Sequence, residues 1–325
     1  MNPEVVIVGS YVQDHAWQVD AFPATGETRR ALRFSTGPGG KGFNQAVASH
    51  RMGARTLFVG AVGADSLGDT ARRFASEQGL TCAWQVLDGV PTAASSIVVD
   101  AQGSNRIAVF LGANERLDPA FLDRCRDRFR SARVVLVQLE NDLEIVRRAL
   151  GLAGEVGAMR VLNPAPMHPE LTGGMLALCD LVTPNESEFS QMLARFADTS
   201  VPPERVAASS ADALHVWCRK LDVPTVVLTL GEHGCFVSHA ESSPLRRGES
   251  SHYRLAGERV DTVDTTGAGD AFSGALAAAL ARLGERPFRE AALNANRAAA
   301  LSTETAGTAP AMPRSEDLAR RFPGR

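Results

Sequence analysis

The stretch "VDTTGAGDAFSGALAAALARL", Val263 to Leu283, places glycines and a carboxylate before a long apolar run that predicts a helix. Gly267, Ala268 and Gly269 would let the first backbone amides of that helix approach a ligand, and bare amides at a helix N-terminus bind phosphate. Asp270 would lie in the first turn, where it can accept a proton from a hydroxyl that attacks the phosphate. The alternative is structural: an acidic residue that complements the helix dipole, beside glycines that permit close packing.

Composition and charge argue against several classes of partner. The chain has 325 residues and a formal net charge of −3 at pH 7, with scattered Lys and Arg, so we expect neither nucleic acid nor a membrane as partner. A strand pattern begins at Val5 and no apolar run reaches membrane-spanning length, which predicts a cytoplasmic protein. The cysteines lack C-x-x-C spacing, as expected of free thiols in a reducing compartment; they are Cys82, Cys125, Cys179, Cys218 and Cys235.

Short apolar runs alternate with helix-length amphipathic stretches along the chain. The apolar runs are typical of strands buried on both faces and occupy 5–9, 56–60, 134–139, 160–163, 181–184 and 225–231. The amphipathic stretches that predict helices include 65–78, 142–156, 210–221 and 287–303. This alternation predicts a three-layer α/β/α fold with a mostly parallel central sheet covered on both faces.

Two regions break this rhythm. Residues 11–36 and 82–112 contain more alternating strands, and "AQGSN" at 101–105 is typical of a hairpin turn. We interpret them as a small, discontinuous β lid on a single α/β domain that spans 1–325. Residues 195–209 and 239–252 have a weak pattern and are expected to be exposed loops.

Polar or small residues follow most of the predicted strands. In open α/β sheets, ligands bind beyond the carboxyl ends of the strands, so these residues predict one crevice. Helix capping and loop formation are the structural alternative for each of them. They are Ser10, Asp14, Glu140, Asn141, Asn163, Asn185, Glu186, Glu188, Gly231, Gly234 and, after a predicted strand "RVDTV" at 259–263, Asp264.

A second glycine cluster, "GPGGKGFNQAVA" at 37–48, contains the weak G-x-G-x-x-G pattern. It does not follow the first strand, which argues against a dinucleotide site, and Lys41 is followed by glycine rather than by the Ser or Thr of a phosphate-binding P-loop. The cluster instead predicts a loop that opens a helix, with Lys41 and Asn44 able to donate hydrogen bonds to hydroxyls. A turn with a solvated lysine is the structural alternative.

Together these motifs resemble the ribokinase (phosphofructokinase-B) superfamily of sugar and nucleoside kinases. The segments "GSYVQDHAWQVDAFPATGET" at 9–28, "GGKGFNQAVA" at 39–48 and "DTTGAGDAFSGAL" at 264–276 are similar to its signatures. Between them "QLE", "LNPAP", "TPNESE" and "TLGEHG" occur in the order of the family, so the resemblance covers nearly the whole chain.

The resemblance implies an ATP-dependent kinase that phosphorylates the primary hydroxyl of a sugar, with D-ribose favoured and D-ribose 5-phosphate as the product. It implies that Asp270 is the catalytic base and that the amides of Gly267, Ala268 and Gly269 form the anion hole. The positions that match the sugar-binding residues, besides Asp270, are Asp14, Gly40, Lys41, Asn44 and Glu140.

The resemblance also implies sites for ATP, Mg²⁺ and K⁺. Asn185 and Glu188 form the N-x-x-E pattern, which in the family governs magnesium, through an indirect contact, and phosphate. The nucleotide positions are Asn185, Thr229, Leu230, Gly231, Glu232, His233, Gly234, Gly269 and Asn296. The positions of the activating K⁺ are Asp264, Thr266, Ser302, Thr305, Gly307 and Ala311.

Departures from the family pattern leave alternatives open. Val12 replaces a sugar-contacting asparagine, and Ala311 replaces a serine that often closes the cation site. Another pentose, a ketose or a nucleoside therefore remains an alternative substrate, and a catalytically silent sugar- or nucleotide-binding regulator is an alternative of another class. The G-x-G-x-x-G pattern suggests a nicotinamide-dependent oxidoreductase. The pattern does not follow the first strand, however, which argues against that activity. The family also implies a homodimer in which the lid sheets pair.

Overall fold

A nine-stranded sheet forms the centre of the molecule in the computed structural model, which describes residues 2–323. Its strand order is β13-β12-β11-β10-β9-β8-β1-β4-β5, and neighbours from β10–β11 to β4–β5 pair in parallel, whereas β12 is antiparallel to both β11 and β13. The strands are β1 (Val5–Val8), β4 (Thr56–Gly63), β5 (Thr81–Leu87), β8 (Val134–Val137), β9 (Met159–Leu162), β10 (Leu181–Val182), β11 (Thr225–Thr229), β12 (Cys235–His239) and β13 (His252–Leu255). The predicted mostly parallel sheet is confirmed.

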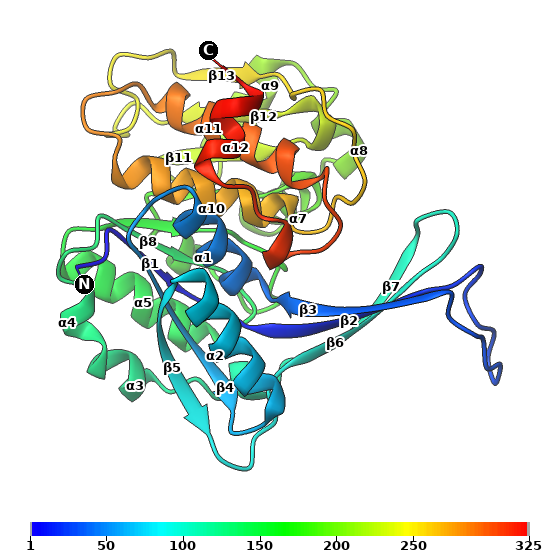
Figure 1. Ribbon diagram of the computed structural model, residues 1–325. Coiled ribbons are helices and arrows are strands. Elements are labelled where there is room, and N and C mark those ends of the chain that lie inside the picture. The colour runs from blue at the N-terminus through cyan, green and yellow to red at the C-terminus, as the bar shows by residue number, and fades with distance from the viewer. Residues whose placement is uncertain (1, 324–325) are drawn as a thin grey trace.

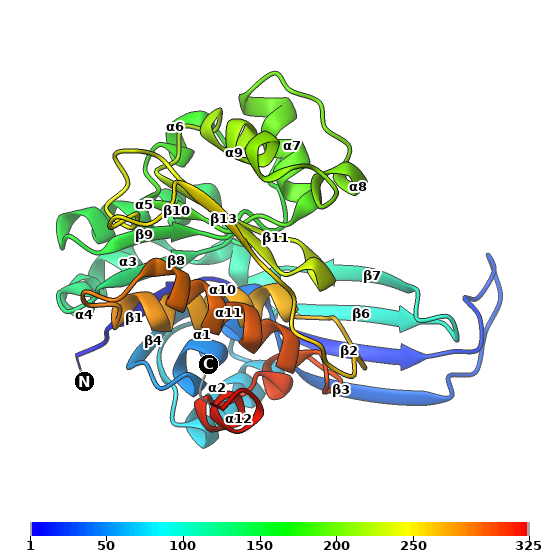
Figure 2. The same ribbon diagram turned by 90° about the horizontal axis from the view of Figure 1, so that it is seen from above.

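Helices cover both faces of this sheet, as Figure 2 shows from above. One face carries α3 (Pro119–Arg124), α4 (Arg126–Phe129), α5 (Leu143–Glu155), α6 (Gly173–Leu176), α7 (Glu186–Phe196), α8 (Pro203–Val206) and α9 (Ala211–Arg219). The other carries α1 (Lys41–Arg51), α2 (Ser66–Gln78), α10 (Ala268–Ala281), α11 (Phe288–Ser302) and α12 (Ser315–Arg321). Each layer of helices encloses its own apolar core, because the central strands are buried on both faces.

Side-chain caps fix where several predicted helices begin. Asp65, Asp142 and Ser210 each accept a hydrogen bond from a backbone amide of the first turn, and the helices start one residue later. Such caps satisfy amides that have no partner within the helix. The short apolar runs and the caps therefore specify this part of the fold locally.

A separate four-stranded sheet projects from the body as an arm (Figure 1). Its order is β3-β2-β6-β7, with β2 (Val12–Gln18), β3 (Arg33–Gly39), β6 (Ala94–Val99) and β7 (Asn105–Phe110). Residues 82–87, which we assigned to this unit, instead belong to β5 at the edge of the large sheet, where they pair in parallel with β4. The second segment of the arm therefore starts at Ala94, because β4 offers the preceding strand a complete ladder of partners.

Two further local expectations were wrong. Residues 259–263 form no strand, and the backbone reaches Asp264 as a loop whose amides at Val263 and Asp264 donate to the carbonyl of Thr303. The segment 195–209 includes the short helix α8, held by the buried Val206. Three 3₁₀ turns complete the described chain: η1 (Gly112–Arg116), η2 (Gly231–His233) and η3 (Ala309–Ala311).

We predict that Gly42→Ala destabilises the protein, because a β-carbon at Gly42 would lie 2.6 Å from the Cα of Gly9. Two backbones meet there and neither can withdraw, so the expected loss is roughly 1–3 kcal/mol of unfolding free energy, measured by urea denaturation. Gly154→Ala is the matched control: Gly154 lies in α5 with no atom within 4 Å of the new methyl, and it should be neutral or stabilising. Equal effects of the two substitutions would contradict the prediction.

Candidate active site

The N-terminus of α10 presents open backbone amides beside a buried carboxylate. Gly267 has φ 80°, a conformation that favours glycine, and stands directly before the helix. Within residues 2–323, the amides of Gly267 and Gly269 have no protein acceptor, whereas the amide of Ala268 donates to the carbonyl of Thr265 (3.2 Å). Asp270 follows in the first turn and is only 6% exposed. Two of the three expected anion-hole amides are thus free to bind a ligand.

Two carboxamides from α1 hold the carboxylate of Asp270. Asn44 donates from Nδ2 to Oδ2 of Asp270 (2.9 Å), and Gln45 donates from Nε2 to Oδ1 (2.9 Å). Burial raises the pKa of Asp270, and the positive charge of Lys41 and the two amide donors oppose that rise. The Oδ1 of Asn44 is buried and has no partner within the described chain, so it is available to a ligand hydroxyl.

Lys41 supplies the positive charge of this cluster. Burial lowers the pKa of Lys41, but the carboxylates of Asp270, Glu140 and Glu188 outweigh burial, so the net pKa is raised and the ammonium stays charged. The backbone amide of Lys41 donates to Glu140 (3.0 Å), which also accepts from the hydroxyl of Ser10. The start of α1 thereby joins Lys41 and Glu140, two of the residues expected to bind sugar.

Asp14 enters the site from the arm. It accepts hydrogen bonds from Ser95 Oγ (2.6 Å) and Thr308 Oγ1 (3.2 Å), and burial raises its pKa. A β-carbon at Gly39 would lie 2.0 Å from Oδ2 of Asp14, and Gly40 has φ 89°. The glycines therefore allow β3 to turn into α1 directly against the carboxylate. Val12 is buried, so the residue that departs from the family pattern packs into the protein here.

The N-x-x-E pattern forms a capping box at the start of α7. Asn185 Oδ1 accepts from the amide of Glu188 (2.8 Å), and Glu188 Oε2 accepts from the amide of Asn185 (2.9 Å). Burial raises the pKa of Glu188 to about 7, with Lys41 lowering it and Asp270 raising it further. The motif therefore caps a helix, as its structural alternative states. The charges of Lys41 and Asp270 also act on the Glu188 carboxylate, so Glu188 interacts electrostatically with the site as well.

The expected nucleotide loop follows β11. Leu230 donates its amide to the carbonyl of Gly234 (2.8 Å) around η2, and Gly234 has φ 84°. Thr229 donates its amide to the carbonyl of Pro184 (3.0 Å), which places this loop beside Asn185. The buried Asn296 donates from Nδ2 to the carbonyl of Ala256 (2.8 Å), so that donor already serves the backbone.

The segments expected to hold the monovalent cation meet at Asp264. Its Oδ1 accepts from the amide of Thr266 (2.9 Å) and its Oδ2 from the amide of Gly307 (3.0 Å). The carbonyl of Thr303 accepts from Val263 and Asp264, so the strand-to-helix loop and residues 302–307 lie side by side. Ser302 and Ala311 are buried, and Thr305 is exposed.

The structure adds residues that the sequence did not identify as part of the site. Gln45 contacts Asp270 directly, Thr308 and Ser95 hold Asp14, and Gln138 contacts Gln45. Asn163, which the sequence analysis expected in the crevice because it follows a predicted strand, also contacts Gln45. Thr308 lies 294 residues from its partner Asp14, and no local pattern relates the two.

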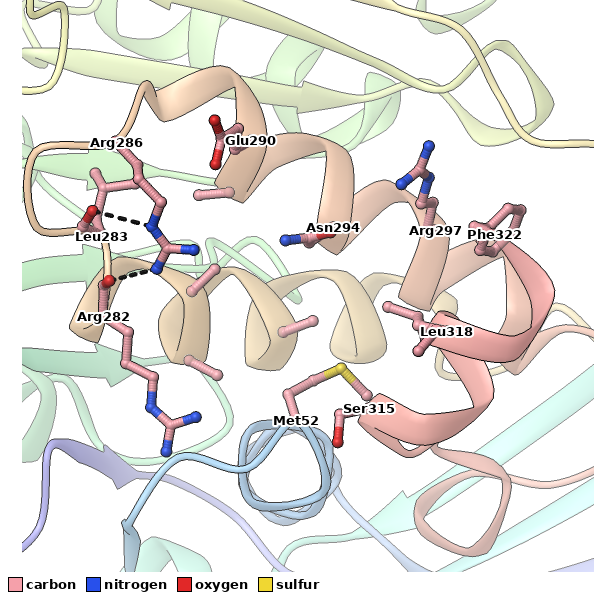
Figure 3. A pocket seen from close by; sticks show the side chains of 15 residues that line it. Met52, Arg282, Leu283, Arg286, Glu290, Asn294, Arg297, Ser315, Leu318 and Phe322 are labelled. Carbon is pink, nitrogen blue, oxygen red and sulfur yellow. Dashed lines mark hydrogen bonds between the residues drawn. The ribbon is translucent and has the colours of Figure 1, made fainter. Parts of the chain in front are cut away.

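The hollow in Figure 3 is a separate feature from this crevice. It measures about 340 Å³ and lies between α10, α11, α12 and the end of α1, with alanines of α10 as part of its wall. Arg286 donates there to the carbonyls of Arg282 and Leu283, which directly follow α10. No residue of the site described above lines this hollow, and Arg286 serves the C-terminus of the helix.

Comparisons with known proteins agree on one family. The profile of the pfkB family carbohydrate kinases matches residues 2–315. Ribokinase of Haemophilus influenzae is 33% identical over 318 residues, covering 98% of this chain and 97% of that protein. Deoxyribokinase of Salmonella typhi is 31% identical over 277 residues and 84% of each chain. The structure of Arabidopsis thaliana ribokinase complexed with ribose and ATP superposes with a TM-score of 0.86, 26% identity and full coverage of both chains.

We predict that Glu188→Gln becomes progressively more stabilising, relative to the unmutated protein, as pH rises from 5 to 8. The folded-state pKa of about 7 exceeds the unfolded value of 4.5, so the folded protein binds more protons and loses stability as pH rises between these values. Glutamine keeps the cap without this titration. Urea unfolding without nucleotide or Mg²⁺ measures the difference, and a difference independent of pH would contradict the raised pKa.

Proposed function

Because this chain belongs to the pfkB family of carbohydrate kinases, we propose that its crevice transfers the γ-phosphate of ATP to the primary hydroxyl of D-ribose. The protein is an ATP-dependent sugar kinase, and its resemblance to the ribokinase superfamily is confirmed. The nicotinamide-dependent oxidoreductase is thereby set aside. D-ribose is favoured because the relatives with high coverage of both chains include ribokinases. The deoxyribokinase relative makes 2-deoxyribose the second candidate.

The observation that carries the proposal is the pairing of Asp270 with the open amides of Gly267 and Gly269. A carboxylate that is held by two amide donors and is 6% exposed is poised to accept the proton of a sugar hydroxyl. The amides one to three residues earlier can stabilise charge on the transferring phosphoryl group. A silent binding protein has no need of a base beside an anion hole, so this pairing argues against the regulator.

Most of the catalytic benefit would come from positioning and charge stabilisation, as is general for phosphoryl transfer. Asp14, Asn44 and Glu140 would accept hydrogen bonds from the sugar and orient its primary hydroxyl toward Asp270. Lys41 would keep its charge inside the cluster and stabilise Asp270 in the ionised form. The arm would close over the sugar and exclude water, which otherwise could take the phosphoryl group.

The nucleotide would bind along the loop Thr229–Gly234, with the nearby Asn185, Gly269 and Asn296. Within residues 2–323, no three His, Cys, Asp or Glu side chains gather closely enough to cage a metal ion. That fits Mg²⁺, which usually binds substrate phosphates and waters with few protein ligands. When bound, Mg²⁺ would neutralise phosphate charge, and Glu188 would hold its water ligands.

The loops around Asp264 fit a large monovalent cation such as K⁺. Their donor set is oxygen: the Asp264 carboxylate and carbonyls of Thr266, Ser302, Thr305 and Gly307, with Ala311 lacking a hydroxyl. The existing hydrogen bonds from Thr266 and Gly307 already draw the two segments onto one carboxylate. We propose that the cation fixes the loop and so the direction of the anion-hole amides.

We also propose that the protein is a homodimer that pairs through its arms. The arm exposes large apolar side chains, with Phe34 53%, Ile107 57% and Phe110 56% exposed. Such a surface on a thin, two-faced sheet is typical of an interaction site.

Within residues 2–323 no helix is long and apolar enough to cross a bilayer. All five cysteines are free thiols, in keeping with the reducing cytoplasm we propose as its compartment.

The test of the function is ADP release with Mg-ATP and a panel of D-ribose, 2-deoxyribose, fructose and nucleosides. We expect D-ribose to have the highest kcat/KM and 2-deoxyribose to be markedly poorer, because groups that bind the missing hydroxyl lose their partner. A nucleoside preferred tenfold over ribose would overturn the substrate assignment.

Asp270→Asn should lose roughly 10²–10⁴-fold in kcat, because asparagine cannot accept the proton. The exposed Asp88→Asn is its control and should match the unmutated enzyme.

Replacing Na⁺ by K⁺ at constant ionic strength should raise kcat, because a bound cation would order the anion-hole loop. Asp264→Ala should abolish the difference between the two salts, since its carboxylate joins both loop segments. Initial rates in the two chlorides measure the effect. Equal rates for the unmutated enzyme would show that no such cation activates it.

A further inference from the structure

Gln45 lies at the centre of a buried chain of carboxamides behind the carboxylate of Asp270. It is fully buried, and its Nε2 donates both to Asp270 Oδ1 (2.9 Å) and to Asn163 Oδ1 (3.0 Å). Its Oε1 accepts a hydrogen bond from Nε2 of Gln138. Asn163 in turn donates to the carbonyl of Thr183 (2.9 Å). The chain thus links α1 and α10 to the ends of three neighbouring strands, β8, β9 and β10.

The neighbours of Gln45 determine which way its amide group faces. Because Gln138 donates to Oε1, the NH₂ group must point toward Asp270 and Asn163, which both accept. The reversed amide would place Oε1 against the carboxylate and leave the donor of Gln138 facing another donor. Gln138 therefore keeps the Gln45 donor directed at Asp270.

Asn44 and Gln45 donate to different oxygens of the Asp270 carboxylate, and they differ in the other hydrogen bonds that they can make. The buried Oδ1 of Asn44 has no partner among the residues that the structure describes. The amide of Gln45 has partners on both of its polar atoms, all of them protein groups. Asn44 can therefore serve substrate as well as Asp270, whereas Gln45 serves only the protein side of the site.

This chain of carboxamides also includes a buried polar atom whose lack of a hydrogen-bond partner costs stability. The Oε1 of Gln138 is buried without a partner among the described residues. A β-carbon at Gly9 would lie 2.1 Å from that oxygen, so glycine at this position leaves room for the Gln138 side chain. Buried polar atoms without partners are uncommon in native proteins and often mark functional positions.

We propose that Gln45 is a positioning residue that orients Asp270 and keeps it ionised, and that Gln138 acts through Gln45. The inference rests on the proposed role of Asp270 as the base. A donor to the charged form of a carboxylate stabilises that form, and burial alone would disfavour it. The two hydrogen bonds from Asn44 and Gln45 would also prevent the carboxylate from rotating away from the substrate hydroxyl.

Gln45→Met, of similar size but without hydrogen-bonding groups, tests the proposal by steady-state kinetics with D-ribose between pH 5 and 9. We expect kcat to fall about tenfold to a hundredfold, with KM for ribose within about threefold. The acid limb of the kcat profile should move up by about one pH unit, because Asp270 loses a donor to its ionised form. A purely structural role would lower activity without moving that limb.

Gln138→Met and the double variant Gln45→Met/Gln138→Met provide a second test. Gln138→Met should shift the acid limb in the same direction by less, and adding it to Gln45→Met should change nothing further, because its only route to Asp270 is already gone. Gln191→Met is the matched control: Gln191 is exposed on α7, donates only to its own helix at Ser187, and should leave the profile unchanged.

An unmoved acid limb in folded Gln45→Met, or additive effects in the double variant, would overturn the proposal. If Gln45→Met does not fold, the shift expected in Gln138→Met decides the question alone. Failure of the proposed function is distinguishable, because then neither ribose turnover by the unmutated enzyme nor its loss in Asp270→Asn would be seen. Turnover that Asp270→Asn abolishes and Gln45→Met leaves intact would refute only the positioning role.

Discussion

The close packing of α1 against α10 is the contact on which the site depends. A β-carbon at Gly274 of α10 would lie 2.3 Å from the carbonyl of Gln45 and 2.7 Å from Cβ of Ala48, so the helices meet at the minimum distance. Gly42 also brings the start of α1 close to Gly9 after β1, since a β-carbon at Gly42 would lie 2.6 Å from the Cα of Gly9. These approaches let the side chains of Asn44 and Gln45 reach Asp270, which lies 226 and 225 residues away in sequence. The proposed substrate contacts, base and anion hole are thereby built on rigid elements.

The buried charges of the site are balanced unevenly. Lys41 faces Asp270, Glu140 and Glu188, and one ammonium cannot neutralise three carboxylates. Asp270 has amide donors that favour its ionised form, whereas burial dominates at Glu188 and lifts its pKa to about 7. The nucleotide position that we propose would bring its phosphates to this excess negative charge, which gives a physical reason for a divalent cation to accompany them. The capping box holds the Glu188 carboxyl group in place, and its hydrogen bond from the amide of Asn185 opposes the rise in pKa.

Local patterns sufficed for most of the fold and for part of the site. The buried strands and the caps at Asp65, Asp142 and Ser210 depend on neighbours within a few residues, so the sequence could predict them. The edge strand β5 resembles the arm strands in pattern, and only its pairing with β4 distinguishes it. The carboxamide chain around Gln45 could not be predicted, because its members come from α1, α10 and the ends of three strands, and their meeting depends on how α1 and α10 pack.

Thr308 shows how the arm and the loops near α10 depend on one another. Its hydroxyl has one hydrogen, which it can donate to Asp14 (3.2 Å) or to the carbonyl of Pro38 (3.0 Å), and both acceptors belong to the arm. The preceding residue, Gly307, donates its amide to Asp264 beside the anion hole. A single short segment therefore contacts the proposed sugar side of the site through Thr308 and the proposed phosphate side through Gly307. In the proposed function, an ion or residue that orders this segment would help to set the distance between Asp14 and the amides of α10, between which the sugar and the transferred phosphoryl group would lie.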